Sequence, residues 1–237
     1  MRVCVALGNS AGKEIPYDYH YLLSSAIYRW IKLGDELLAT KLHYSKEIKP
    51  FTFSELLGKM VAVDDKYMRI NSENVSLIFS SPIKEYVSAF IEGCLQAAEL
   101  RIGKLSFPVE RVEILRKPEI KNRMTFKTLS PVVVSTGIRK RDKVDKWYLY
   151  PTDKNWYINI ERNLRKKYEF LYGRTAEGTL RIKVLNFKPK KYTVKGPVRA
   201  SHLTFEASGN TDLIEIGYFA GFGERTAQGF GCVEVVK

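Results

Sequence analysis

The sequence predicts an α+β protein made of two tandem ferredoxin-like domains, each an RRM-like βαββαβ unit. Three observations predict this class. Both halves of the 237-residue chain show strand-type and helix-type hydrophobic patterns in that order. The length suits two small domains with modest cores, and 45% hydrophobic with 12% aromatic residues excludes a disordered chain. We expect the domains to cover 1–117 and 118–237. The halves share no visible sequence identity, so the repeat is one of architecture.

The N-terminal half contains strand and helix patterns in the order β-α-β-β-α-β. Alternating or β-branched segments predict strands over 2–7, 51–56, 61–70, 74–80 and 99–115. The third and fourth of these are expected to form a hairpin-like pair. Helical spacing of apolar residues predicts helices over 19–33, 35–43 and 83–98. Asp35 can cap the second helix, and Pro82 can open the third at a first-turn position that proline tolerates.

The C-terminal half repeats this plan. Strand patterns cover 125–136 (broken by Pro131), 179–187, 201–209 and the last residues, 231–237. Helices are predicted over 153–173, ending at Gly173, and over 210–220, capped by Asn210 or Thr211. The polar, basic stretch 137–147 is expected to be a loop. The basic segment 188–200 is expected to form a turn or a hairpin arm.

The positive charge lies almost entirely in the second half. Residues 1–117 carry 16 Lys and Arg against 14 Asp and Glu, whereas 118–237 carry 23 against 12. A basic field confined to one half raises the local concentration of a polyanion and supplies phosphate contacts. We therefore favour nucleic-acid binding over a surface that is merely rich in lysine. A membrane surface is disfavoured, because no segment joins a strong apolar face to a basic one.

The cysteines and the apolar runs exclude several other classes. Cys4, Cys94 and Cys232 are odd in number and scattered, which suits a reducing cytoplasm rather than a disulfide framework or a zinc site. No apolar run reaches the ~20 residues of a membrane-spanning helix, and no signal peptide is visible. We expect a cytoplasmic protein without a membrane partner.

The most distinctive segment is the glycine loop, residues 221–231, with two Gly-Phe-Gly units separated by five residues. A dinucleotide fingerprint would need glycine at Thr226 and a following helix, and a phosphate-binding P-loop would need Gly-Lys-Ser/Thr. Both are absent from the sequence. Glycines permit positive φ and close backbone approach, so the loop can expose N–H groups to phosphate. The alternative is a tight connection whose own geometry requires glycine. The two pairs flank Arg225, which favours a ligand role alongside that geometry.

The order of elements and this loop are typical of a known superfamily. End to end, the chain resembles the RAMP superfamily of CRISPR-associated RNA-binding proteins. Within it the chain is similar to the endoribonucleases that cut precursor CRISPR RNA within its repeats (the sixth numbered Cas family, "Cas six"). The glycine loop is specific to the superfamily, and the N-terminal segments narrow the match to the nuclease branch. The segments that carry the resemblance are Pro16-Tyr17, Ser24 to Tyr28, Leu42-His43, Phe51 to Ser54 and Thr128 to Pro131.

Histidine suits the proton transfers of RNA cleavage, because its pKa lies near neutrality. His20 and His202 are expected to be surface or packing residues. His43 ends a helix before a basic segment, and on position alone it could equally cap that helix. The resemblance implies a catalytic Tyr28 on the first helix, where Tyr28 and Arg29 can face a groove, with His43 and Lys49. Lys46 is a competitor of Lys49.

The resemblance implies metal-independent cleavage without a cofactor. The 2′-hydroxyl attacks the phosphate, leaving a 2′,3′-cyclic phosphate and a 5′-hydroxyl, while a lysine neutralises the phosphorane. The resemblance also implies that CRISPR repeat RNA is the partner. A CRISPR effector complex and a second copy of the chain, in a homodimer, are possible further partners. A non-catalytic, RNA-binding RAMP scaffold is the alternative. The expected RNA-binding residues are Arg139, Lys140, Arg141, Lys188, Lys190, Lys191, Arg199, Gly221, Gly223, Arg225, Gly229 and Gly231. Trp147, Trp156 and Tyr192 are candidates for stacking on unpaired bases.

Overall fold

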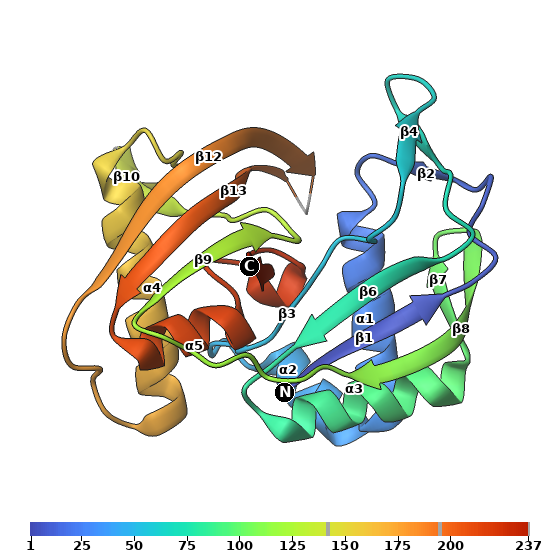
Figure 1. The fold of residues 1–237 in the computed structure, drawn as a ribbon, viewed down its shortest axis with the longest axis horizontal. Helices are drawn as coiled ribbons and strands as arrows, with labels where there is room; N and C mark the ends of the chain where they lie inside the picture. The colour runs from blue at the N-terminus through green and yellow to red at the C-terminus, as the bar shows by residue number, and fades with distance from the viewer. Residues whose placement is uncertain (141–142, 194–195, 237) are drawn as a thin grey trace.

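The structure is a computed structural model that describes residues 1–140, 143–193 and 196–236. Figure 1 shows two lobes side by side, each with helices packed against an antiparallel sheet. We call β1 to β8 with α1 to α3 the N-terminal lobe, and β9 to β14 with α4 and α5 the C-terminal lobe. The predicted α+β class with two tandem ferredoxin-like domains is confirmed. The expected boundary at 117/118 falls between β8 and β9 and stays a prediction.

The N-terminal lobe has a five-stranded sheet in the order β3-β6-β1-β8-β7. Its strands are β1 (Arg2–Leu7), β3 (Thr52–Phe53), β6 (Val75–Ser80), β7 (Glu99–Ile102) and β8 (Leu105–Ile114). Its helices are α1 (His20–Gly34), α2 (Glu36–Tyr44) and α3 (Lys84–Ala97). A separate small sheet contains β2 (Glu14–Pro16), β4 (Met60–Ala62) and β5 (Tyr67–Ile70). Helices α1 and α3 pack on one face of the large sheet, and α2 follows α1 directly (Figure 1).

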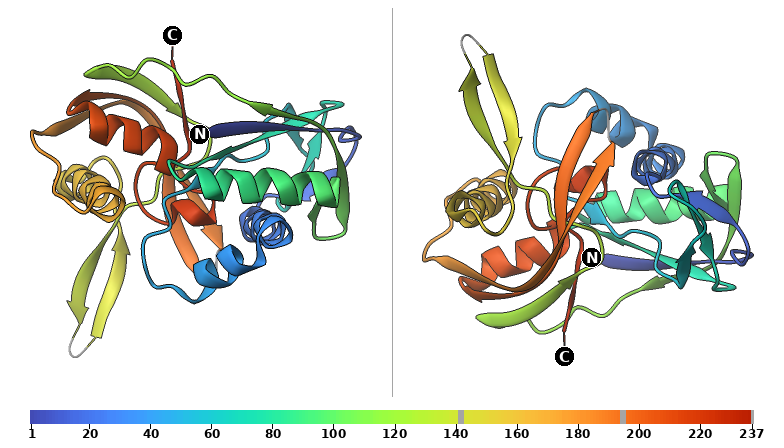
Figure 2. Two further views of the ribbon diagram at one scale, coloured as in Figure 1. Left: turned by 90° about the horizontal axis from the view of Figure 1, so that it is seen from below. Right: turned by 90° about the horizontal axis from the view of Figure 1, so that it is seen from above.

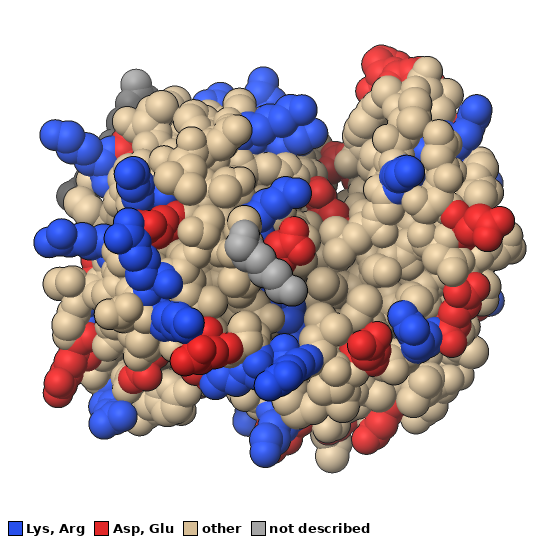
Figure 3. All heavy atoms as spheres, in the orientation of Figure 1, with Lys and Arg blue, Asp and Glu red and all other residues tan. Residues whose placement is uncertain are grey.

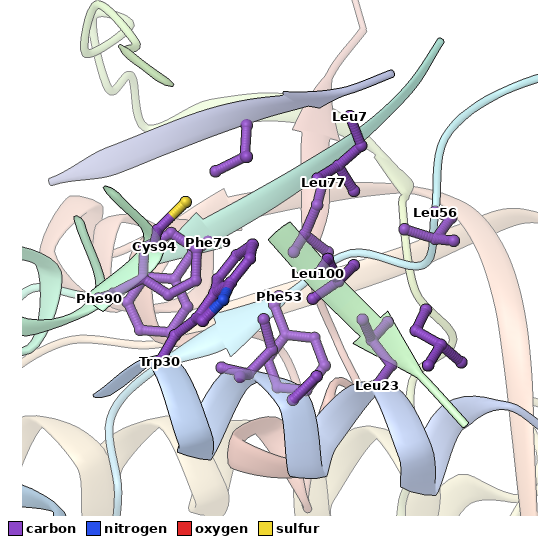
Figure 4. Packing of buried hydrophobic residues seen from close by; sticks show 14 of the residues in the cluster. Leu7, Leu23, Trp30, Phe53, Leu56, Leu77, Phe79, Phe90, Cys94 and Leu100 are labelled. Carbon is purple, nitrogen blue, oxygen red and sulfur yellow. The ribbon is translucent and has the colours of Figure 1, made fainter. Parts of the chain in front are cut away.

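The core of the N-terminal lobe is an aromatic cluster under α1 (Figure 4). Phe79 of β6 stacks on Phe90 of α3 with ring centroids 4.2 Å apart, and Trp30 of α1 meets Phe90 edge-on at 5.4 Å. Burying each such ring contributes roughly 1.5–3 kcal/mol. The cluster fixes α1 against the sheet.

The C-terminal lobe has a four-stranded sheet in the order β12-β13-β9-β14. Its strands are β9 (Arg123–Thr128), β12 (Leu180–Thr193), β13 (Pro197–Gly209) and β14 (Val233–Val235). Its helices are α4 (Lys154–Tyr172) and α5 (Thr211–Ala220). The long hairpin β12–β13 includes the predicted basic arm. This lobe buries a second core that includes Trp156, Phe126, Phe205 and Phe222.

Most predicted helix ends are confirmed by their capping contacts. The side chain of Asp35 accepts a hydrogen bond from Leu38 N, and that of Asn210 accepts one from Leu213 N. Gly173 ends α4 with φ 65°. Pro82 is different, since α3 begins at Lys84 and the proline precedes the helix. Within the described residues, no helix is both long enough and apolar enough to cross a membrane.

The predicted loop over 137–147 is wrong. The described residues of this stretch belong to an antiparallel hairpin, β10 (Ser135–Lys140) with β11 (Lys143–Tyr148). Figure 2 shows this hairpin projecting from the body of the molecule. A projecting two-stranded ribbon has no buried face, so its sequence lacks the alternation by which strands are recognised. Its charged composition therefore resembles that of a loop.

The predicted hairpin-like pair of 61–70 with 74–80 is also wrong. In this region β4 and β5 pair with each other, and β5 pairs with β2 in the small sheet. The following strand, β6, joins the large sheet between β1 and β3. The strand expected over 74–80 is confirmed as β6, but the single strand expected over 61–70 is two strands, β4 and β5. Alternation indicates which face of a strand is buried and not which strand lies beside it.

Candidate active site

A hollow of about 410 Å³ lies between α1 and α2. We call it the α1–α2 groove. Helix α1 contributes Ser25, Tyr28, Arg29 and Lys32, and α2 contributes Ala39, Thr40, His43 and Tyr44. The structure thus brings together two of the three residues expected to be catalytic, the phenol of Tyr28 and the imidazole of His43.

The local sequence explains why His43 faces this groove. Helix α1 ends at Gly34, and Asp35 immediately caps α2, so the chain turns between the two helices with a single intervening residue. Ala39 and Leu42 bury the inner side of α2. His43 lies in the last turn of α2 and is exposed, with its ring edge-on to Tyr44 at 5.2 Å.

Tyr28 is half-buried at the base of the groove. Its ring meets Phe51 of the core at 5.8 Å. Burial raises the pKa of Tyr28 to about 12, and the neighbouring Tyr86 adds to the shift. At neutral pH the phenol therefore keeps its proton. It is suited to donating a hydrogen bond or a proton, not to removing one.

Lys49 does not line the α1–α2 groove. It is half-buried in the segment between α2 and β3, where its carbonyl accepts a hydrogen bond from Phe51 N at 2.8 Å. Burial lowers the pKa of Lys49. The cations that line the groove are Arg29 and Lys32, and the latter pairs with Glu36 at 3.3 Å. Lys32 was missed by the sequence reasoning, although it lies one helical turn from Tyr28 on the same face of α1.

The glycine loop is buried between the two lobes. Gly221, Gly223, Gly229 and Gly231 have φ between 75° and 86°, a region that favours glycine. A Cβ on Gly229 would lie 2.3 Å from the ring of Phe53 in the other lobe. The four glycines thus satisfy the geometry of a tight inter-lobe joint. Their part in RNA binding stays a prediction.

Side chains of the N-terminal lobe hold the carbonyl groups of this loop. Thr52 donates its hydroxyl to Phe230 O at 2.8 Å. His20 Nε2 lies 2.7 Å from Gly229 O, and since a carbonyl only accepts, Nε2 carries the proton. His20 is buried, as expected for a packing residue, and its ring lies 4.4 Å from that of Phe230.

Lys167 of α4 holds the other end of the loop. Its ammonium donates to the carbonyl oxygens of Gly221 at 2.7 Å and Gly223 at 2.9 Å. The side chain is 3% exposed, and burial lowers its pKa to about 7. No local pattern indicated this role, because Lys167 stands in a run of basic helical residues.

The carboxylate of Glu55 connects the two lobes near the glycine loop. Glu55 accepts a hydrogen bond from Tyr192 OH at 2.8 Å and lies 3.3 Å from His202 Nε2 and 3.8 Å from His20 Nδ1. Burial alone would raise the pKa of Glu55, but His202, with His20 and Tyr192, outweighs it and holds the pKa below its usual value. Tyr192 is occupied here and Trp156 is fully buried, so neither ring is free to stack on a base.

The basic residues expected to bind RNA lie mainly on the long hairpin of the C-terminal lobe. Lys188 is opposite His202, and Lys191 is opposite Arg199, so the two pairs occupy opposite faces of the β12–β13 hairpin. Lys190 shares the face of Lys188. On the face shown in Figure 3, Lys and Arg gather over the C-terminal lobe, whereas the N-terminal lobe mixes both signs of charge.

The remaining predicted RNA-binding residues lie on or beside the projecting hairpin. Arg139 and Lys140 belong to β10, opposite Val144 and Lys143. Arg141 lies outside the described residues. Arg225, in the middle of the glycine loop, donates to Tyr148 OH at 3.1 Å and so connects the loop to β11.

Two family models match adjacent parts of the chain. The model described as "CRISPR-associated protein Cas6, N-terminal" matches residues 14–113, and "CRISPR associated protein Cas6, C-terminal" matches residues 115–235. Together they span both lobes.

Full-length relatives agree with these matches. The chain is 34% identical to "CRISPR-associated endoribonuclease Cas6 1" of Methanocaldococcus jannaschii, over 100% of this chain and 93% of the relative. It is 35% identical to "CRISPR-associated endoribonuclease Cas6" of Pyrococcus furiosus, over 94% and 84%. A solved structure named "An RAMP protein binding different RNA substrates" superposes with a TM-score of 0.91 at 30% identity, covering 100% of both chains.

Proposed function

The chain belongs to the Cas6 family of CRISPR-associated proteins, and from this membership we propose how its two lobes divide the cutting of a repeat RNA. It is an endoribonuclease that acts on CRISPR precursor RNA. The observation that carries the proposal for the active site is that Tyr28 and His43 line one open groove.

In this groove the scissile phosphate would lie between α1 and α2. His43, whose exposed imidazole can accept a proton, takes the proton of the 2′-hydroxyl as that oxygen attacks phosphorus. Tyr28, which keeps its proton at neutral pH, hydrogen-bonds the phosphate or protonates the departing 5′-oxygen. The P–O5′ bond breaks as the O2′–P bond forms. The products are a 2′,3′-cyclic phosphate and a 5′-hydroxyl.

A cation neutralises the crowded phosphorane in this scheme. We assign that role to Lys49, with Lys46 second. The half-buried position of Lys49 supports the assignment, because an ammonium with reduced hydration interacts more strongly with an anion. Arg29 and Lys32 line the groove itself and are the cations to test beside Lys49. The scheme needs no metal ion.

The C-terminal lobe supplies most of the grip on CRISPR repeat RNA. The charge imbalance of residues 118–237 and the exposed lysines of β12 support this division. A CRISPR effector complex and a second copy of the chain are further partners in the proposal. Three free cysteines suit a reducing compartment, and we place the protein in the cytoplasm.

A non-catalytic RNA scaffold is the second candidate. Such a protein needs the basic lobe but not a tyrosine and a histidine in one accessible groove. The position of His43 therefore favours the nuclease. A scaffold would bind the repeat and leave it intact.

Incubation of the protein with a repeat RNA in excess chelator tests the function. We expect a single cut with 5′-hydroxyl and 2′,3′-cyclic phosphate ends. A matched RNA with one 2′-deoxy nucleotide at the cut should bind equally and stay intact. Cleavage of the deoxy substrate, or loss of cleavage with chelator, would contradict the scheme. Competition by single-stranded DNA as strong as that by RNA would instead indicate a DNA-binding protein.

A further inference from the structure

A second hollow, distant in sequence from the α1–α2 groove, lies where the projecting hairpin meets the long hairpin. Its volume is about 430 Å³, within the ~300–1,000 Å³ range of small-molecule sites. We call it the Trp147 pocket. It is lined by Lys146, Trp147 and Tyr148 of β11, by Gly196 just before β13, by Pro197 and Arg199 at the start of β13, and by Arg225 of the glycine loop.

The pocket presents one free aromatic plane. Of the three tryptophans of the chain, Trp30 and Trp156 are buried, whereas Trp147 is 51% exposed. The guanidinium of Arg199 lies over its ring, 5.7 Å from the centroid. An exposed indole beside an arginine offers an apolar plane with a cation at its side, and a nucleic-acid base can stack on such groups.

The side chains around the Trp147 ring include positive charges, and hydrogen bonds hold one of them, Arg225, in place. Arg225 donates to Tyr148 OH at 3.1 Å and to Gln228 Oε1 at 3.3 Å, so its guanidinium is oriented before any ligand arrives. Its Nε is buried and has no hydrogen-bond partner among the described residues. The nearby carboxylate of Glu224 is already engaged by Ser135 and by Lys146 at 3.4 Å.

We propose that the Trp147 pocket holds one unpaired nucleotide of the bound RNA, its base stacked on Trp147 and its phosphate held by Arg199 and Arg225. This rests on the proposed function, since it assumes that RNA is the substrate. The nucleotide lies outside the cleaved bond, because no residue of the pocket belongs to the α1–α2 groove.

The placement of the pocket favours an RNA chain over a free nucleotide. Both views in Figure 2 show the projecting hairpin and α2 on the same side of the molecule, so one strand can pass from the pocket to the groove. Lys191 lies opposite Arg199 on the long hairpin and continues the positive surface beyond the pocket. The pocket thus anchors the strand at a fixed distance from the cut.

Tryptophan fluorescence reports on stacking of a base on Trp147, because the other two tryptophans are buried. We expect an uncleavable 2′-deoxy repeat to quench the wild-type emission, and Trp147→Phe to abolish the quenching while retaining most of the affinity. Trp147→Ala should weaken RNA binding about 5- to 150-fold, the range for loss of one base stack. Arg111→Ala, an exposed cation on β8, is the control and should leave both readings unchanged.

The outcomes separate this inference from the proposed function. RNA that binds and is cut without any change in fluorescence overturns the pocket and leaves the nuclease intact. Equal affinity of Trp147→Ala and the wild type also overturns it. Quenching by AMP or UMP at the concentrations at which the repeat RNA quenches would make the pocket a free-nucleotide site and contradict the RNA anchor. Fluorescence quenching with no cut in the all-ribose repeat supports the pocket and contradicts the nuclease.

Discussion

The two lobes share a fold and differ in what each adds to it. In the N-terminal lobe the first helix is followed at once by α2, and the groove between them contains Tyr28 and His43. In the C-terminal lobe the first helix, α4, is followed by the long β12–β13 hairpin with its lysines. In our proposal the same scaffold therefore carries the chemistry in one lobe and most of the RNA-binding charge in the other. The comparison shows that the two lobes differ in the element that follows the first helix.

The glycine loop belongs to the C-terminal lobe and is the joint between these two regions. It is held by His20 and Thr52 from one side and by Lys167 from the other. A substitution in the α1–α2 groove should therefore affect RNA cleavage alone, and a substitution in the β12–β13 hairpin should affect RNA binding alone. A substitution in the glycine loop should affect both.

The largest expected effect is that of His43→Ala, which should separate RNA cleavage from RNA binding. His43→Ala should lower the single-turnover cleavage rate by about 10²- to 10⁴-fold, the contribution of a general acid or base. Its Kd for the repeat should stay within about twofold, since the lysines and arginines of the protein supply most of the phosphate contacts. Lys41→Ala, an exposed residue of the same helix, is the control. A His43→Ala protein that cuts at the wild-type rate would end the assignment.

The next effect tests the joint. Gly229→Ala and Gly12→Ala both place a side chain at positive φ, 86° and 78°. At Gly229 the new Cβ meets Phe53, whereas at Gly12 it meets no described atom within 4 Å. We expect Gly229→Ala to cost about 2–4 kcal/mol in the free energy of unfolding and Gly12→Ala about 1 kcal/mol. Urea denaturation measures both, and equal losses would show that the loop is not wedged between the lobes.

Removal of positive charge tests the contribution of the C-terminal lobe to RNA binding. Replacing Lys188, Lys190 and Lys191 by alanine should weaken repeat binding about tenfold or more. It should also reduce the slope of log K against log salt by about 2, since each single-strand phosphate contact contributes about 0.7. Cleavage at saturating protein should be unchanged. The triple variant of Arg101, Lys104 and Arg111 removes the same charge from the N-terminal lobe, and an equal slope change there would contradict the division.

The smallest effect concerns acid stability of the joint. Burial lowers the pKa of His20, against the opposing effect of Glu55, so the unfolded chain takes up a proton first as the pH falls below about 6.5. Stability contributed by the neutral ring is therefore present above that pH and is lost below it. We expect the wild type to lose about 1 kcal/mol between pH 7.5 and 5.5. His20→Gln, which keeps an N–H donor, should lose less over that range in urea titrations, and an equal loss would remove His20 from the explanation.

Much of this arrangement could be predicted from the sequence. Helix periodicity and capping residues indicated α1, α2, α4 and α5, and the charge imbalance separated the two lobes. The roles proposed for Tyr28 and His43 came from a resemblance to a family, and neither residue alone indicated that both would line one groove.

The features that could not be predicted depend on contacts between distant segments. The β10–β11 hairpin lacks a buried face and so lacks alternation, and Tyr192 gave no sign that Glu55 would occupy its hydroxyl. Lys167 looks like its basic neighbours until the carbonyls of the glycine loop surround it. Pairwise contacts of this kind are set by packing, which local patterns do not encode.

A photocrosslink tests the central claim most directly, because it locates the cut RNA on the protein. Tyr44 lines the α1–α2 groove and is 80% exposed, so p-benzoylphenylalanine can replace it without disturbing the core. With an uncleavable repeat bound, we predict crosslinks to the nucleotides that flank the scissile bond. Crosslinks confined to nucleotides far from that bond, in a protein that still cuts the all-ribose repeat, would place the chemistry outside this groove.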